Sequence, residues 1–178
     1  MRRGWPVVLV LLVLADDALL RATRPGYAVL GLLDEPAHLA TGLLVTAAVA
    51  GVVGGLSRSV WVAAALSTVL IDADHLPAAL GSQLLTEGTP RPYTHSVTTV
   101  VVLAVAALAV RGRPVRAVLA GCAVGVTAHL VRDVGTAPVA LWWPLSDAGV
   151  SMPYVAYAAV LVAAAAVTLT ADARVPPP

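Results

Sequence analysis

Residues 115–133, VRAVLAGCAVGVTAHLVRD, combine an apolar run of membrane-spanning length with two potential metal ligands near its end. A helix needs roughly 17 to 25 mainly apolar residues to cross a bilayer, and this stretch meets that requirement. His129 and Asp133 are four positions apart, so they lie on the same face of a helix. The stretch therefore predicts a transmembrane helix that ends in a pair of side chains able to bind one metal ion.

Further apolar stretches of similar length surround this one, at 5–22, 37–56, 58–74, 95–110 and 152–170. The 178-residue chain is 59% hydrophobic and 12% charged, with a mean hydropathy of +0.88. These values are typical of a polytopic membrane protein rather than a soluble domain. The sequence predicts an all-α bundle of about six transmembrane helices that forms a single domain over residues 1–174. The proline-rich residues 175–178 cannot continue a helix and are predicted to be a disordered tail.

The first apolar stretch has a second interpretation. Arg2 and Arg3 precede an apolar run at 7–15, and Val13 and Ala15 occupy the positions of small residues before a cleavage point. This order resembles a secretory signal peptide. If residues 1–15 are a cleaved signal rather than a retained helix, five transmembrane helices remain.

Two compositional features exclude other classes of protein. The formal net charge of +1 offers no large basic surface, so nucleic acid is not an expected partner. The single cysteine, Cys122, allows neither an intrachain disulfide nor a Cys-x-x-Cys metal or redox motif. It lies within an apolar stretch, where it is expected to pack as a small hydrophobic residue.

The arginines predict an orientation in the membrane. With six crossings, one side of the bilayer receives Arg2, Arg3, Arg58, Arg111, Arg113, Arg116 and Arg174. Cytoplasmic loops carry an excess of arginine, so this side is expected to face the cytoplasm of a bacterial-type cytoplasmic membrane. The opposite side carries both arginines and acids, so the excess of arginine on the predicted cytoplasmic side is moderate.

All four histidines lie beside acids or hydroxyl groups where apolar stretches begin or end. His38 begins the second predicted crossing, His75 ends the third, His95 begins the fourth and His129 lies near the end of the fifth. Because successive helices alternate in direction, all four clusters reach the same membrane face. Ionisable groups near hydrocarbon are costly, so their accumulation predicts a binding site. The assumed orientation places this site on the extracytoplasmic face.

The donor set predicts the metal. Mixed imidazole and carboxylate donors favour zinc, with manganese or iron as alternatives. The candidates outnumber one tetrahedral shell, so either two ions are bound or the surplus groups orient the ligands of one. The candidate ligands are Glu35, His38, Asp72, His75, His95, His129 and Asp133.

Each cluster taken alone has a simpler explanation. A single histidine at a membrane interface is more often a hydrogen-bonded surface or core group than a ligand. Asp34 and Glu35 could be acids at the N-terminus of a helix. Asp72 and Asp74 could lie in a turn. Taken together, these explanations require every histidine of the chain to lie beside an acid or hydroxyl group on the same membrane face without taking part in a binding site.

The order of the motifs resembles the YdjM-type family of membrane-bound, metal-dependent hydrolases. The motifs are His38-x-x-x-Gly42, Asp72-x-Asp74-His75, Arg91-x-x-Thr94-His95-Ser96, and His129-x-x-x-Asp133 followed by Leu141-Trp142-Trp143-Pro144-Leu145. The resemblance covers roughly residues 37 to 146, and its specificity lies in the order of the motifs. The family is distantly similar to zinc phospholipase C and related zinc nucleases, which implies phosphoester hydrolysis.

We expect a membrane-embedded hydrolase that uses metal-activated water, with a pKa lowered towards about 7, to cleave a phosphoester. Asp74 is the predicted general base, and Arg91 or Arg132 is predicted to bind the phosphate. A site at the interface should meet a phospholipid or a lipid-linked phosphate. Two non-enzymatic functions stay open: a carrier or sensor of divalent metal, and a structural protein held together by a closed metal site.

Overall fold

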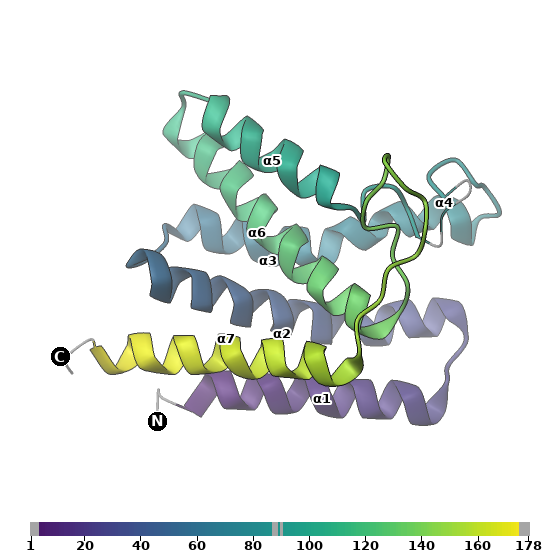
Figure 1. The fold of residues 1–178 in the computed structure, drawn as a ribbon, viewed down its shortest axis with the longest axis horizontal. Helices are drawn as coiled ribbons and strands as arrows, with labels where there is room; N and C mark the ends of the chain where they lie inside the picture. The colour runs from purple at the N-terminus through teal and green to yellow at the C-terminus, as the bar shows by residue number, and fades with distance from the viewer. Residues whose placement is uncertain (1–3, 87–88, 90, 175–178) are drawn as a thin grey trace.

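The computed structural model describes residues 4–86, 89 and 91–174, and within them it is an all-α bundle (Figure 1). The predicted tail at 175–178 lies outside these residues. Two short segments follow α3: the 3-10 helix η2 (Ile71–His75) and α4 (Leu76–Ala79). The only β pairing among the described residues is an isolated bridge between Val139 and Val150. The longer helices are α1 (Trp5–Thr23), α2 (Tyr27–Val53), α3 (Arg58–Leu70), α5 (Val97–Ala109), α6 (Arg113–Thr136) and α7 (Tyr154–Arg174).

Four helical segments are long and apolar enough to cross a membrane: Val29–Val53, Arg58–Ala79, Arg113–Thr136 and Tyr154–Arg174. The other two predicted crossings are also helices, but they meet this description less well. The α1 helix carries Asp16, Asp17 and Arg21 within its 19 residues. The α5 helix has only 13 residues. The chain is therefore a multi-pass membrane protein in which α1 and α5 differ from the other helices in charge and length.

The helices alternate in direction, as predicted. The ends of α1, α3 and α6 and the starts of α2, α5 and α7 gather at one end of the bundle, on the right of Figure 1. The loops at 80–96 and 137–153 lie at this end. Arg58, Arg113 and Arg174, which begin or end their helices, lie at the opposite end.

The start of α2 differs from the prediction. The helix begins at Tyr27 with Gly26 at its N-cap, and it continues through Pro36. Asp34, Glu35 and His38 therefore lie inside the helix, and the alternative that the two acids cap its N-terminus is wrong. Proline is tolerated within membrane helices because neighbouring groups can satisfy the carbonyl that it leaves unpaired. The expectation of a helix start after Pro36 followed the rule for soluble helices.

Two groups of helices make up the bundle. The α1, α2 and α7 helices lie side by side in Figure 1, around buried Val13, Leu44 and Leu161. In the second group, α6 packs against both α3 and α5. The N-terminal stretch is thus part of the packed bundle, because Val10 and Val13 of α1 lie in its core.

The α3 and α6 helices approach closely at two glycines of α6. A Cβ atom on Gly121 would lie 2.5 Å from the Val60 carbonyl oxygen. A Cβ atom on Gly125 would overlap the Ala64 carbonyl oxygen and the Ser67 hydroxyl group. Small residues allow helix backbones to approach in membranes. This close approach brings the end of α3, with Asp72, beside His129 and Asp133 of α6.

Replacing Gly125 by alanine is expected to destabilise the bundle by about 1 to 3 kcal/mol, as overpacking in a close-packed interior does. The added methyl group meets backbone, which cannot rotate away. Gly31→Ala is the matched control, because a Cβ atom there meets nothing within 4 Å. Thermal unfolding in detergent should show a lower midpoint for Gly125→Ala only. Equal midpoints for the two variants would contradict the proposed contact.

Candidate metal centre

The structure brings the four histidines together from four separate elements. The rings of His38 in α2 and His129 in α6 are stacked, with centroids 4.0 Å apart. The His95 ring, which precedes α5, is 4.9 Å from His129 and 5.0 Å from His75 of η2. His38, His95 and His129 are fully buried. The predicted gathering of the four side chains into one pocket is present.

Asp72 lies at the centre of these rings. Its Oδ1 atom is 3.1 Å from His95 Nε2 and 3.4 Å from the Nε2 atoms of His75 and His129. Its Oδ2 atom is 3.9 Å from His38 Nε2. The η2 segment explains this position, because a 3-10 helix has three residues per turn and aligns the side chains of Asp72 and His75. One carboxylate thus contacts all four imidazoles.

Asp133 is a second carboxylate in contact with these rings, and it is fully buried. Its Oδ2 atom is 3.2 Å from His129 Nε2 and 3.6 Å from His95 Nε2. Its Oδ1 atom is 3.7 Å from His38 Nε2 and 3.1 Å from Arg91 Nη1. The predicted pairing of His129 with Asp133 on one helix face is therefore observed.

The hydrogen bonding of His129 shows that the donor set fits a cation. His129 Nδ1 lies 2.7 Å from the Thr68 carbonyl oxygen and donates a proton to it. The other ring nitrogen, Nε2, has no hydrogen-bond partner in the described chain and lies 3.2 Å from Asp133 Oδ2 and 3.4 Å from Asp72 Oδ1. If the ring is neutral, the Nε2 lone pair is repelled by these two carboxylates unless a positive charge, either a proton or a metal ion, lies between them. Histidine ligands of metals usually donate their other ring proton in this way.

The candidate donors form two adjoining groups. In each group, one ligand atom per residue lies within 4.8 Å of the others: His38, His129 and Asp133 in the first, and Asp72, His75 and His95 in the second. Zinc binds nitrogen and oxygen at about 2.0 to 2.2 Å, so ligands of one ion lie within roughly 4 Å of each other. Modest closure of either group would suit zinc. The contacts of Asp72 with His38 and His129 connect the two groups.

Two predicted residues, Glu35 and Asp74, lie beside these groups rather than in them. Glu35 interacts with Asp72, and its Oε2 atom is buried without a hydrogen-bond partner in the described chain. Asp74 accepts a hydrogen bond from Thr94, and its Oδ2 atom is 3.4 Å from His95 Nδ1. Asp74 therefore contacts the nitrogen of His95 that faces away from Asp72. This is the position of a residue that orients a ligand.

The protonation of His95 is coupled to this arrangement. Burial alone would lower the pKa of this imidazole, but its hydrogen bonds with Asp72 and Asp74 and the charge of Asp133 outweigh burial and raise the pKa above its usual value. His95 lies between two membrane-spanning segments, in the turn before α5. A metal ion bound there must displace this proton, so protons and metal compete for the ring.

The two arginines predicted to bind phosphate have different environments. Arg91 lies in the loop before His95, contacts Asp133 and keeps part of its side chain exposed. Arg132 is fully buried on the side of α6 that faces α1 and α7. It forms ion pairs with Asp16 at 3.3 Å, with Asp17 at 2.8 Å and with Asp34, and it donates a hydrogen bond to the Tyr157 hydroxyl group at 3.0 Å. Arg91 remains a candidate for phosphate binding. The contacts of Arg132 are instead those of a residue that holds α1, α2, α6 and α7 together.

Sequence reasoning missed the partners of Arg132 and the supports of the histidines. Asp16 and Asp17 reach Arg132 from α1, and Asp34 contacts both Arg132 and His38, the latter at 3.1 Å. A charged residue within an apolar helix is itself a signal that a partner exists. The sequence contains no signal that selects Asp17 rather than another acid. The hydrogen bond from His129 to the Thr68 carbonyl oxygen cannot be predicted from sequence, because every residue has a backbone carbonyl.

The comparisons with known proteins agree with the order of motifs. A family model described as YdjM inner membrane protein matches residues 33–176, which include all the candidate ligands. No curated protein and no solved structure matches the chain. The family match covers most of the sequence, from a point within α2 to the end of α7. The chain belongs to the YdjM inner membrane protein family.

Proposed function

We propose that the protein is a membrane-embedded, metal-dependent hydrolase that cleaves a phosphoester in a lipid or lipid-linked substrate. The observation that carries the proposal is the convergence of four imidazoles on Asp72, three of which also contact Asp133, with Nε2 of His129 within 3.4 Å of both carboxylates. An arrangement of this kind is costly without a cation. Its two adjoining donor groups fit a pair of zinc ions, with manganese or iron as alternatives.

The candidate ligands divide by position. His38, His129 and Asp133 would hold one ion, and His75 and His95 would hold a second. Asp72 would contribute to both, because it contacts residues of each group. When bound, such ions polarise a phosphoryl oxygen and make water acidic enough to act as a nucleophile near neutral pH. Asp74 would hold His95 in orientation through Nδ1.

Two side chains are placed for the chemistry of hydrolysis. The reaction forms a bond between a water oxygen and phosphorus and breaks the ester bond between phosphorus and the leaving oxygen. Glu35, rather than the predicted Asp74, is our candidate to accept the proton of water and return it to the leaving oxygen, because its Oε2 atom is buried and has no hydrogen-bond partner in the described chain. Arg91, at the rim of the site, would bind a non-bridging phosphate oxygen.

The position of the site supports a lipid substrate on the extracytoplasmic face. The site lies at the end of the bundle opposite Arg58, Arg113 and Arg174. Arginine is enriched on the cytoplasmic side of membrane proteins, which orients the site outward. The ligands lie towards one end of the bundle, so a phosphate at the site would lie on the headgroup side of that leaflet.

Replacing His129 by alanine tests the proposal. Purified wild-type protein is expected to contain zinc or a similar metal by elemental analysis and to hydrolyse at least one of phosphatidic acid, phosphatidylglycerol and a water-soluble aryl phosphodiester. His129→Ala should lose most of the metal and lower kcat by more than about 100-fold, beyond the effect of removing a residue that only orients a ligand. Thr127→Ala, on an exposed position of α6, is the control and should change neither. Unchanged metal content and turnover in His129→Ala would refute the assignment.

A carrier of divalent metal is the second candidate, and the position of His38 within α2 favours it. Transport sites lie towards the middle of the bilayer, and His38 is well inside the segment Val29–Val53. A carrier would move zinc into liposomes in a manner that His129→Ala abolishes, without hydrolysing any phosphoester. Hydrolysis without uptake would favour the enzyme.

A further inference from the structure

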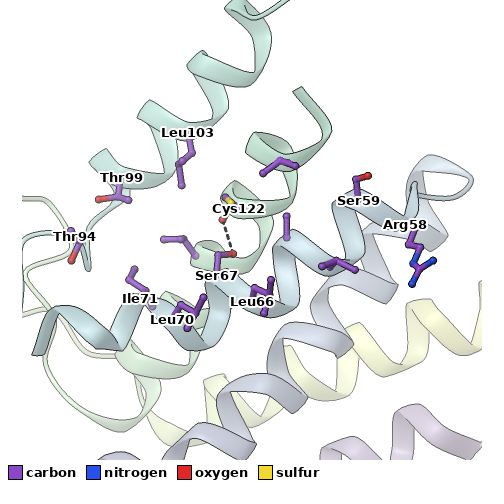
Figure 2. Close-up of a pocket in the computed structure, with 14 residues that line it drawn as sticks. Arg58, Ser59, Leu66, Ser67, Leu70, Ile71, Thr94, Thr99, Leu103 and Cys122 are labelled. Atoms are coloured by element: carbon purple, nitrogen blue, oxygen red, sulfur yellow. Dashed lines mark hydrogen bonds between the residues drawn. The ribbon is translucent and has the colours of Figure 1, made fainter. Parts of the chain in front are cut away.

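A cavity of about 720 Å³ lies between α3, α5 and α6 (Figure 2). The α6 helix packs against both of its neighbours and forms the floor, while α3 and α5 form the two walls. The volume is within the range of about 300 to 1,000 Å³ that is typical of ligand pockets. Its lining includes Arg58, Leu66, Ile71, Thr94, Leu103 and Val118.

The walls of the cavity suit a hydrocarbon chain. Aliphatic side chains form most of its lining, and the Ser67 hydroxyl is turned to the Ala64 carbonyl at 3.2 Å and the Cys122 carbonyl at 3.4 Å. That hydroxyl group therefore already has acceptors within the protein. A polar ligand would find few hydrogen-bond partners along this wall, whereas an apolar chain has no hydrogen bonds to lose when it enters.

The cavity opens sideways into the bilayer. Leu66 and Leu70 of α3, which line it, are 53% and 61% exposed. They belong to the membrane-spanning segment Arg58–Ala79, so what they face is hydrocarbon rather than water. The bulk component of that hydrocarbon is the acyl chains of glycerophospholipids, which can enter from the side.

One end of the cavity meets the candidate metal centre. Ile71 directly precedes Asp72, and Thr94 both lines the cavity and donates a hydrogen bond to Asp74. Arg58 and Ser59 line the other end. Along α3, from Arg58 to Leu70, the rise is about 20 Å at 1.5 Å per residue. This exceeds half of the roughly 30 Å hydrocarbon thickness of a bilayer, so the cavity is long enough for one lipid tail of one leaflet.

We propose that this cavity binds one acyl chain of a glycerophospholipid whose phosphate lies at the metal centre. The inference rests on the proposed function and specifies its substrate class. The acyl chain lies between α3 and α5 against α6, and the headgroup lies beside Thr94 and Asp74. The cavity thus selects a substrate embedded in the membrane over a soluble phosphoester.

Photo-crosslinking tests the cavity without requiring hydrolysis. The probe is phosphatidic acid with a diazirine in the middle of one acyl chain, incorporated with the full-length protein into phosphatidylcholine vesicles. Crosslinks in the wild-type protein are expected on peptides that contain Leu66, Leu103 or Val118. Leu103→Trp should fill the cavity and remove most of these crosslinks. Leu108→Trp carries the same substitution on α5 at an exposed position outside the cavity lining and should keep them.

Turnover provides the second measurement. Leu103→Trp should lower kcat/KM for a long-chain phospholipid at least about tenfold, since loss of burial for about two methylene groups accounts for that factor. It should leave hydrolysis of a water-soluble aryl phosphodiester unchanged. Val118→Trp, on the α6 side of the cavity, gives the same test if Leu103→Trp does not fold.

The outcomes separate the inference from the proposed function. Crosslinks that survive in Leu103→Trp and Val118→Trp, or that map to the outer faces of the bundle, overturn the cavity assignment even if the protein is a hydrolase. A second copy of the chain crosslinked across the cavity would overturn it as well. Cavity crosslinks in a protein that hydrolyses no phosphoester would show a lipid-tail site and refute the enzymatic proposal alone.

Discussion

Replacing Asp72 by asparagine is expected to remove nearly all bound metal, whereas replacing His75 by alanine should remove only part of it. Asp72 contacts all four histidines, while His75 belongs to only one of the two donor groups. Asparagine keeps the shape of the side chain but removes the negative charge that a cation needs. The expected loss in metal affinity is larger than the 10- to 100-fold that follows from removing a residue that only orients a ligand.

Elemental analysis of the purified variants, together with phosphoester turnover, measures this difference. Asp147→Asn is the control. This aspartate is exposed in the loop 137–153, so its substitution makes the same chemical change at a position away from the histidines. If two ions share Asp72, the wild type contains about twice as much metal as His75→Ala, and Asp72→Asn contains almost none. Full metal content in Asp72→Asn would show that this carboxylate is not a ligand.

Replacing Arg132 by methionine is expected to destabilise the protein by about 3 to 5 kcal/mol, the usual cost of removing one partner of a buried ion pair. Methionine fills a similar volume, so the effect arises from charge. Without the guanidinium group, the carboxylates of Asp16, Asp17 and Asp34 face one another within the bundle. Asp34 also contacts His38, so this change should reach the metal centre.

Thermal unfolding in detergent checks this result, with Arg116→Met as the control on the same helix at an exposed position. Combining Arg132→Met with Asp17→Asn should recover part of the lost stability, since the two side chains are in direct contact and their effects are not additive. A stable Arg132→Met protein with a raised KM would instead support the predicted role of Arg132 in phosphate binding.

The contrast between Arg91 and Arg132 shows where sequence reasoning reached its limit. Both arginines lie near candidate ligands in the sequence, and the prediction that one of them binds phosphate does not distinguish between them. The side on which a helical residue lies is set by spacing along the helix, but its partner depends on which helix packs there. Arg132 is three positions after His129 and faces α1 and α7, where Asp17 and Tyr157 meet it.

The same limit applies to Asp74 and Asp72. The sequence places both next to His75 without distinguishing them. The 3-10 geometry of η2 aligns Asp72 with His75 and turns Asp74 towards Thr94 and His95. This 3-10 geometry arises directly after the end of α3, and no local sequence pattern predicts it.

The all-α class, the alternation of the helices and the gathering of four histidines at one end of the bundle could all be predicted from the chain alone. These follow from the lengths of apolar runs and from the parity of crossings, which are properties of the chain alone. Three features appear only in the folded structure: α2 begins at Tyr27, Arg132 pairs with three aspartates, and Asp72 rather than Asp74 lies among the histidines. These depend on distances between helices remote in sequence, and close packing at Gly121 and Gly125 sets such distances between α3 and α6.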